Sequence, residues 1–365
     1  MTSQVTQDDK AIRILCTGGL SGYLASFIFE AIGKHNIQQY TKIQYLPTSR
    51  NLDLGDTSES GPTTFRFRTP EEVTNASKTL LELEPDVIVH AAAMAALPKC
   101  EQNPNEAMEA NCPSGLLDAI DLAEQDSDSS WSLRRLIYLS TDQVYQGNAD
   151  SSGRVVVPSP SGFTCNFLER NTKEETLWPP ILPNELPPPV NMYGRSKLAF
   201  ESLLMERRSK NKGDCVILRL SNMIGPVSPL TGDGRFLQWL DVALSVSPSA
   251  EKISLFVDEY RNFVYVRDVA RAVLNVSLSM SQNLAPVYNV GGQINLSRYD
   301  FGKLVCHVKG FEFKDSNVGE KKRADIADAA YESPLNIGMD SSALKRDFID
   351  FEFTPMEVAL KESLL

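Results

Sequence analysis

Short apolar runs alternate along the chain with longer segments in which apolar residues recur at helical spacing. Such runs are typical of buried strands, and proline, glycine or acidic residues at the ends of the longer segments mark helix termini. We predict strands over 12–16, 42–46, 64–68, 85–90, 136–140 and 215–220. We predict helices over 22–32, from 70 onward, over 105–123 and over 193–208. This alternation indicates an α/β fold, a Rossmann-type doubly wound parallel sheet with helices on both faces.

The composition narrows the class of protein. The chain has 365 residues, 42% of them hydrophobic, which is enough for a large core in one or two domains. Its net charge of -11 argues against a nucleic-acid partner, because neutralising many phosphates needs a basic face. Six scattered cysteines, a polar start and the lack of an apolar run of bilayer length predict a cytoplasmic protein with reduced thiols and no membrane contact.

A glycine-rich turn follows the first predicted strand. Residues 17–25 read TGGLSGYLA, which places the turn between a strand and a helix. Backbone without side chains lets N–H groups and the helix dipole meet the negative charge of a pyrophosphate. Counted from Gly19 the spacing is GxxGxxA, and counted from Gly18 it is one residue too long, so the phase stays open. The candidate cofactor-binding residues are Thr17, Gly18, Gly19, Gly22, Tyr23 and Leu24.

The end of the second predicted strand bears on the choice of dinucleotide. An Asp or Glu there usually holds the ribose of NAD, whereas this chain has Pro47-Thr48-Ser49-Arg50. The hydroxyl of Ser49 and the guanidinium of Arg50 suit a 2′-phosphate, which favours NADP(H) over NAD(H). Asp53 leaves NAD(H) open, and a solvated Arg50 is the simpler alternative.

Small residues follow the strand predicted over 85–90. Ala91, Ala92 and Ala93 would let a cofactor approach the backbone at this strand end. We interpret His90 as a structural residue, because no other metal-ligating side chains accompany it. No metal site is predicted.

Tyr193 and Lys197 stand four residues apart, on one face of a predicted helix. A neighbouring ammonium favours the phenolate and lowers the pKa of a tyrosine, which makes the phenol a usable proton donor or acceptor for a carbonyl/alcohol pair. The spacing is common by chance, so an accidental pair on a surface helix is the competing interpretation. Thr141, after the strand over 136–140, adds a hydroxyl that can hydrogen-bond the reacting oxygen.

Several segments in order resemble the extended short-chain dehydrogenase/reductases. Within them the resemblance is to the branch of dTDP-4-dehydrorhamnose reductases and the regulatory β subunit of methionine adenosyltransferase. The segments are TGGLSGYLA, PDVIVHAAA, CEQNPNEAMEAN, LSTDQVYQG, NMYGRSKLAFE, VILRLSNMIGP, RNFVYVRDVARAV and YNVGGQINLSRYDFG. They cover nearly the whole chain and are more specific for fold than for substrate.

The resemblance implies a catalytic set and a division of the chain. The set is Asn111, Thr141, Tyr193 and Lys197, with Tyr193 as general acid and Lys197 lowering its pKa and holding the nicotinamide ribose. The division is a NAD(P)-binding Rossmann domain over 11–220, to which 262–290 return, and a smaller C-terminal substrate-binding lobe over 221–261 and 291–365. Cations for a diphosphate could come from Arg235, Arg261, Arg267 and Arg298, although surface or ion-paired arginines are an equally simple interpretation.

A long segment over 148–189, rich in Ser, Pro and Gly, is expected to form a loop or flap. The expected function is NADPH-dependent reduction of a keto group on a nucleotide-linked deoxysugar. Superfamily dehydratases carry Thr-Asp-Glu where this chain has Thr141-Asp142-Gln143, and an amide cannot do the acid/base work of the glutamate. Two alternatives stay open: a sugar-nucleotide epimerase, and an NADP-binding regulatory subunit docked on a methionine adenosyltransferase catalytic subunit. A homodimer is also left open.

Overall fold

A parallel sheet forms the centre of the molecule. The computed structural model describes residues 11–18, 22–39, 42–49, 63–147, 180–245, 253–313, 318–326 and 330–365. Within them seven strands lie in the order β11-β6-β5-β4-β1-β2-β3, all paired in parallel. They are β1 (Ile12–Thr17), β2 (Ile43–Ser49), β3 (Thr63–Thr64), β4 (Val87–His90), β5 (Arg135–Thr141), β6 (Asp214–Leu220) and β11 (Val287–Val290). The strand order reverses between β1 and β4, so the expected doubly wound fold is confirmed.

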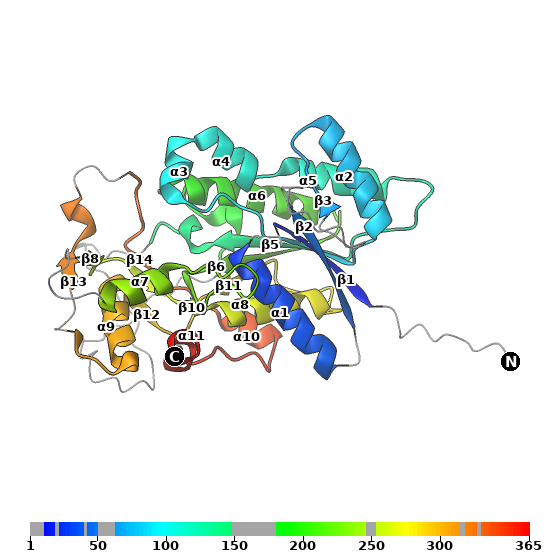
Figure 1. Ribbon diagram of the computed structural model, residues 1–365. Coiled ribbons are helices and arrows are strands. Elements are labelled where there is room, and N and C mark those ends of the chain that lie inside the picture. The colour runs from blue at the N-terminus through cyan, green and yellow to red at the C-terminus, as the bar shows by residue number, and fades with distance from the viewer. Residues whose placement is uncertain are drawn as a thin grey trace.

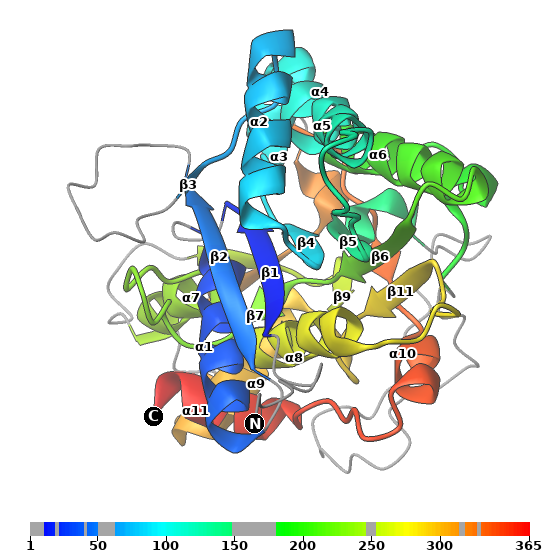
Figure 2. The ribbon, with the colours of Figure 1, turned by 90° about the vertical axis from the view of Figure 1, so that its right-hand side faces the viewer.

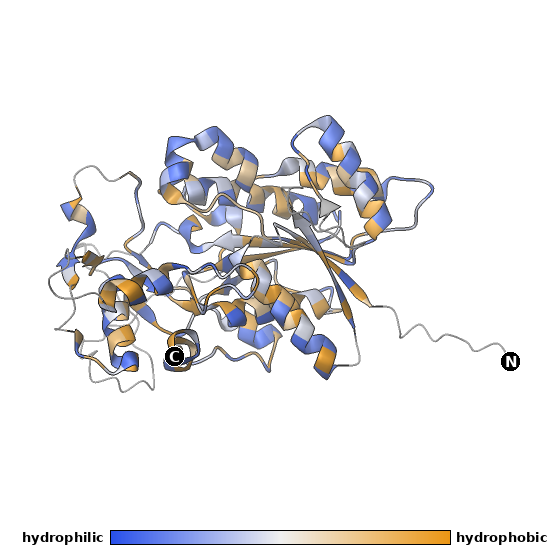
Figure 3. Ribbon diagram, viewed as in Figure 1, coloured by the Kyte–Doolittle hydropathy of each residue, from blue (hydrophilic) through white to orange (hydrophobic). Residues whose placement is uncertain are grey.

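Helices cover both faces of this sheet (Figure 1 and Figure 2). On one face α1 (Tyr23–Gln38) packs against α8 (Val266–Leu278), and on the other lie α2 (Pro70–Leu83), α5 (Ser114–Glu124) and α6 (Met192–Ser209). Successive strand residues point to opposite faces, so both cores draw on every strand and the strands read as continuous apolar runs. In Figure 3 the helices carry both apolar and hydrophilic residues, as expected of helices with one buried face.

Smaller sheets and helices of the C-terminal part lie at the end of the large sheet away from β1 and β2 (Figure 1). The strands pair as β7 (Met223–Ile224) with β10 (Val264–Tyr265), β8 (Ile253–Phe256) with β13 (Val318–Lys321), and β9 (Tyr260–Asn262) between β12 (Asn295–Ser297) and β14 (Asn336–Ile337). The helices are α7 (Phe236–Ser245), α9 (Arg298–Lys309), α10 (Ser342–Asp347) and α11 (Met356–Leu364). The predicted division into domain and lobe stays a prediction.

Two predicted elements differ from the structure. The helix predicted over 105–123 is broken into α4 (Pro104–Asn111) and α5, because Pro113 lacks an N–H and clashes with a preceding helical turn. The strand predicted over 64–68 ends at Thr64, because β2 ends at Ser49 and, among the described residues, no strand pairs with the segment beyond Thr64. A short helix, α3 (Leu97–Gln102), and two 3-10 turns, η1 (Asp142–Val144) and η2 (Pro183–Glu185), complete the elements used below.

Other expectations concern single residues and segments. Cys16, Cys100, Cys112, Cys215 and Cys306 are free thiols, as predicted, and Cys165 lies outside the described residues. Of the segment predicted to form a loop or flap, 148–179 also lie outside them. No helix in the described part of the chain combines the length and the apolar character needed to cross a bilayer.

Candidate active site

The turn between β1 and α1 is closed by two glycines, Gly18 and Gly22, while Gly19 lies outside the described residues. Gly18 has a φ of 73°, a left-handed conformation that favours glycine, and its N–H donates to the Thr48 hydroxyl at 3.2 Å. A Cβ at position 22 would lie 2.9 Å from the carbonyl oxygen of Gly18. A side chain at either of these two glycines would therefore crowd neighbouring backbone.

Thr17 ties the ends of β1 and β4 together. Its hydroxyl oxygen accepts from the N–H groups of Ala91 and Ala92 at 3.1 and 3.3 Å. Its own proton then goes to Nδ1 of His90, 2.8 Å away. His90 thus holds the strand end, the structural role expected for it. Ala93, the third predicted alanine, lies partly buried in the loop that follows.

Tyr23 and Leu24 begin α1 with side chains turned away from any ligand. Both are buried in the core, and the Tyr23 hydroxyl donates to the carbonyl of Pro226 at 2.8 Å. Their N–H groups belong to the first turn of α1, which has no intrahelical acceptors. Of Tyr23 and Leu24, therefore, only the backbone N–H groups are available to an anion.

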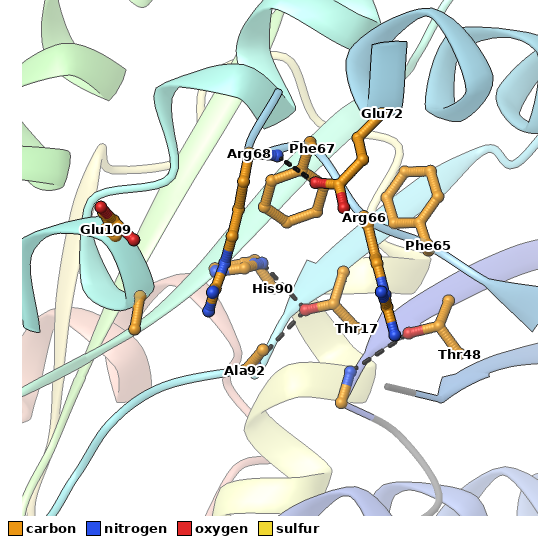
Figure 4. A pocket seen from close by; sticks show the side chains of 12 residues that line it. Thr17, Thr48, Phe65, Arg66, Phe67, Arg68, Glu72, His90, Ala92 and Glu109 are labelled. Carbon is orange, nitrogen blue, oxygen red and sulfur yellow. Dashed lines mark hydrogen bonds between the residues drawn. The ribbon is translucent and has the colours of Figure 1, made fainter. Parts of the chain in front are cut away.

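A cavity of about 310 Å³ opens where β1, β2 and β4 end. Thr17, Gly18, Thr48, His90 and Ala92 line it from the sheet, and 65–68 close it from the other side. Figure 4 shows Arg66 and Arg68 extending over it, Arg66 toward Thr48 and Arg68 toward His90. We call this the arginine cavity.

The sequence does not single out Arg66 and Arg68, because the pattern predicts a regular strand over 64–68. The repeated Phe-Arg-Phe-Arg over 65–68 was the available signal. Ser49 closes β2, while its side chain and the whole of Arg50 lie outside the described residues. Their predicted contact with a 2′-phosphate stays a prediction.

The second group of predicted residues lies at the carboxyl end of β5. Thr141 ends that strand, and its hydroxyl oxygen accepts from the N–H of Gln143 at 3.2 Å. Tyr193 lies in the first turn of α6. A Cβ on Gly194 would collide with the carbonyl oxygen of Gln143. The start of α6 is thus in backbone contact with η1.

The pKa of Tyr193 is raised above its ordinary value, contrary to the sequence-based expectation. Burial is the largest cause and the Asp142 carboxylate adds to it, whereas the hydrogen bond with Thr141 acts in the opposite direction. The Lys197 ammonium instead donates to the Leu139 carbonyl at 2.7 Å and lies 4.2 Å from the centre of the Tyr138 ring. As it stands, the site keeps Tyr193 protonated.

Lys197 lies in a buried network of charges. Burial lowers the pKa of Lys197 to about 7, and the carboxylate of Glu201, one turn along α6, acts against this shift. Glu201 accepts from Arg219 at 2.6 Å and from the Ser140 hydroxyl at 2.5 Å, and neither member of the ion pair is exposed. Arg219 also donates to the Tyr145 hydroxyl at 2.9 Å. The network fixes the β5 side of α6.

Asn111 has a supporting place behind this group. Its Oδ1 accepts from the N–H of Met94 at 2.8 Å, and its Nδ2 donates to the Met94 carbonyl at 3.1 Å and to the Ser196 hydroxyl at 2.9 Å. The side chain is fully buried. Asn111 therefore joins the loop after β4 to α6.

The arginines proposed for a diphosphate differ in their surroundings. Arg261 is buried against Asp142 and the 333–335 segment, and Arg267 pairs with Glu30 and Glu362. Arg235 is exposed beside the Tyr23 ring, and Arg298 faces Glu259 at 4.0 Å. Three of the four, Arg261, Arg267 and Arg298, therefore lie against carboxylates of the protein itself. Across the described residues no cluster of three or more His, Cys, Asp or Glu side chains could hold a metal ion.

The sheet order, the glycine turn at its switch point and the Tyr-Lys helix beside β5 define the class: an NAD(P)-dependent oxidoreductase of the extended short-chain dehydrogenase/reductase type. The chain belongs to the NAD dependent epimerase/dehydratase family, whose model matches residues 14–291. The resemblance in the sequence is thereby confirmed.

Relatives with described functions are distant. The chain is 26% identical over 231 residues to the probable low-salt glycan biosynthesis reductase Agl14 of Haloferax volcanii, covering 63% of this chain and 61% of that protein. It is 24% identical to methionine adenosyltransferase 2 subunit beta of Danio rerio, covering 77% and 72%. Among solved structures, dTDP-4-dehydrorhamnose reductase of Bacillus anthracis in complex with NADP matches with a TM-score of 0.66 at 19% identity, covering 96% and 98%.

Proposed function

We propose that the protein uses NADPH to reduce a keto group on a nucleotide-linked deoxysugar, with Tyr193 as the general acid. The observation that carries this proposal is the position of Tyr193 in the first turn of α6, which meets η1 through main-chain atoms directly after Thr141 at the carboxyl end of β5. A protonated phenol beside a second hydroxyl can hydrogen-bond a carbonyl oxygen and give it a proton. Lys197 lies one helical turn further, where it would hold the nicotinamide ribose.

The residues around the glycine turn fit a nicotinamide dinucleotide. The bare backbone at Gly18 and Gly22 and the first turn of α1 suit a pyrophosphate, and Arg66 and Arg68 give the arginine cavity two cations for a 2′-phosphate. Bound there, the cofactor supplies the hydride. The Bacillus anthracis reductase, solved with NADP, supports the choice of NADP(H).

The amide of Gln143 supports reduction over dehydration. Its Nε2 donates to Asp142 at 3.0 Å and its Oε1 accepts from Asn191 at 3.0 Å, so both ends are engaged in positioning neighbours. A side-chain amide does not ionise near neutral pH, so it cannot act as a general acid or base. A dehydratase would need a titratable group here.

The test is NADPH oxidation, followed by absorbance, with a panel of dTDP- and UDP-linked 4-keto-6-deoxyhexoses. We expect turnover with at least one of them. Tyr193→Phe should lower kcat by about 100-fold or more, since a positioned general acid contributes roughly 10² to 10⁴. The affinity of that variant for NADPH, measured by fluorescence titration, should match the unsubstituted protein. Turnover that survives the substitution would contradict the role of Tyr193.

A regulatory function is the second candidate, because a methionine adenosyltransferase β subunit aligns with 77% of the chain. In that case the protein would bind the dinucleotide and dock on a catalytic synthetase subunit. Mixing the purified protein with such a subunit and measuring the complex by sedimentation would test this. A complex, together with no turnover on the whole panel, favours regulation. The same measurement on the protein alone tests the homodimer that the sequence leaves open.

A further inference from the structure

The side chain of Asn191, directly before α6, is fully buried and has no part in the mechanism above. Its Oδ1 accepts from the N–H of Gly194 at 2.8 Å, so the residue caps the helix. Aspartate, serine and threonine can give the same cap with a side-chain oxygen. Capping therefore accounts for the amide oxygen of Asn191, and the amide nitrogen needs another explanation.

The amide nitrogen of Asn191 donates to two other parts of the chain. Nδ2 lies 3.0 Å from Oε1 of Gln143, on η1, and 3.2 Å from the carbonyl oxygen of Glu332. These partners stand 48 residues before and 141 residues after Asn191 in the sequence. Since an amide nitrogen carries two protons, both are used. One buried side chain thus joins the start of α6, η1 and the C-terminal part of the chain.

The bond to Gln143 leads on to Thr141. The hydroxyl oxygen of Thr141 accepts from the N–H of Gln143 at 3.2 Å, which fixes the backbone of Gln143. The side chain of Gln143 also donates to Asp142 at 3.0 Å, so its oxygen faces Asn191. A turned amide would place two donors face to face at Asn191. Hydrogen bonds through Gln143 and Asn191 therefore connect the Thr141 hydroxyl with the N–H of Gly194, in the first turn of α6.

The main-chain contact between Gly194 and Gln143 cannot fix this arrangement alone. A steric contact resists closer approach, but it does not oppose separation or sliding. Each hydrogen bond of Asn191 supplies what the contact lacks, because it is attractive and weakens steeply when its angle changes. Together the two features set the distance and the direction of the first turn of α6 relative to η1.

The segment that accepts the second bond of Asn191 is itself held. Glu332 comes directly before Ser333 and Pro334 in the chain. The buried guanidinium of Arg261 donates to the serine hydroxyl at 3.0 Å and to the proline carbonyl at 2.7 Å. Arg261 lies on β9, so the segment is tied to one of the smaller sheets. Through Asn191, the start of α6 is placed relative to the C-terminal part as well as to the large sheet.

We propose that Asn191 is a positioning residue, which holds Tyr193 in place relative to Thr141 and to the segment 332–334. The inference rests on the proposed function, in which Tyr193 gives its proton to the substrate oxygen beside the Thr141 hydroxyl. Such a transfer is efficient only while the groups around the oxygen keep their distances, and a misplacement of about 1 Å can cost roughly 100-fold in rate. Losing the ties of Asn191 should therefore slow the reaction without removing any reacting group.

The test is Asn191→Ser in the full chain. Serine keeps an oxygen that can cap α6, but it is too short to reach both Gln143 and Glu332. The value of kcat for NADPH-dependent reduction of a keto sugar should fall by about 10-fold or more, whereas KM for that sugar should change less. The affinity for NADPH, measured by fluorescence titration, should not change, because the glycine turn is untouched.

Two further variants separate positioning from stability. Asn36→Ser removes a side chain that bonds both backbone groups of Ile43 at 2.8 Å, at the amino end of β2 and away from the site. It should leave kcat unchanged, although it removes two hydrogen bonds. Gln143→Met removes the acceptor on η1 while Asn191 stays. The losses in kcat for Gln143→Met and Asn191→Ser should not multiply in the double variant, because both substitutions break the same bond.

A measurement without turnover uses monofluorotyrosine at position 193 in the full chain with NADP⁺ bound. The ¹⁹F NMR resonance reports the surroundings of the ring. In Asn191→Ser the resonance should shift or broaden, because the first turn of α6 is no longer held by η1 and the segment 332–334. In Asn36→Ser it should match the unsubstituted protein.

The outcomes distinguish this inference from the proposed function. If the protein reduces keto sugars, an unchanged kcat in Asn191→Ser, or losses that multiply fully in the double variant, overturn the inference alone. If no keto sugar is turned over, the proposed substrate class fails and the resonance of position 193 decides. A shifted or broadened line then supports the inference, and an unchanged line overturns it.

Discussion

Two regions at the carboxyl ends of the strands differ in how firmly they are built. Beside β5 and α6, the side chains of Asn111, Lys197, Glu201 and Arg219 are fully or almost fully buried and bonded to other parts of the protein. In the arginine cavity, the lining residues Arg66 and Arg68 are exposed and come from 65–68, which no strand pairs beyond Thr64.

The difference follows from what each region has to do. Proton transfer depends on distances and charges that must not vary, so its groups are fixed by the same contacts that hold the core together. Recognition of a phosphate needs only cations within reach, and these can stand on an exposed segment at little cost to the fold. Substitutions should therefore affect stability in the first region and affinity in the second.

The largest expected effect is on the ion pair between Glu201 and Arg219. Arg219→Met would leave the Glu201 carboxylate buried without its guanidinium, which costs about 3 to 5 kcal/mol. Urea unfolding should show this loss in the free energy of unfolding. The double variant Glu201→Leu/Arg219→Met should recover part of it, because the buried carboxylate is removed together with its guanidinium. A loss under about 1 kcal/mol in the single variant would show that the network is not what fixes this region.

A smaller effect is expected at Asn111. Asn111→Ala removes three hydrogen bonds and leaves the N–H of Met94 without its acceptor and the Met94 carbonyl with the Cys100 thiol as donor, at a cost of about 1 to 3 kcal/mol. Turnover should fall as well, because α6 is no longer joined to the loop after β4. The matched control is Asn103→Ala, an exposed asparagine, expected to change stability by less than about 0.5 kcal/mol. Equal losses of stability in the two variants would contradict the structural role of Asn111.

The smallest expected effect on the fold is at the arginine cavity. Arg66→Gln/Arg68→Gln should weaken NADPH binding by about tenfold, or roughly 1.4 kcal/mol, because a charge-assisted contact with the 2′-phosphate is lost. Affinity for NADH and the free energy of unfolding should stay as they were. Lys78→Gln, which removes an exposed cation on α2, should leave both affinities unchanged. An equal loss of affinity for NADH would show that the arginines do not contact the 2′-phosphate.

The alternation of apolar runs predicts β1, β2, β4, β5 and β6 and most of the helices beside them, since both faces of these strands are buried and leave a clear signal. The strand β11 and the helix α8 are not among the predicted elements. Pro113 shows where the pattern is insufficient. Apolar spacing continues through 105–123 and predicts one helix, but the helical backbone cannot continue through Pro113. The segment 65–68 shows another limit, because alternation predicts an extended chain without saying whether a partner strand lies beside it.

Motifs also predicted which residues gather at the end of β5, but not the charge balance there. The spacing of Tyr193 and Lys197 suggested that the ammonium governs the phenol. In the structure the Lys197 ammonium donates to the Leu139 carbonyl, and burial is the largest influence on the pKa of Tyr193, which spacing cannot reveal. The networks of Lys197 and Asp142 join strands and turns that are far apart in the sequence, so no local pattern announces them.

The close contact at Gly194 limits which substitutions this protein can accept during evolution. Since the first turn of α6 meets η1 through main-chain atoms, no residue with a side chain can be accepted there without pushing the helix away from Gln143. Substitutions at Thr141 or Tyr193 alter the chemistry but leave their separation intact. The spacing between the two hydroxyls is thus set by this main-chain contact, which single substitutions cannot change gradually. Adaptation to a new substrate would therefore have to come from substitutions elsewhere in the molecule.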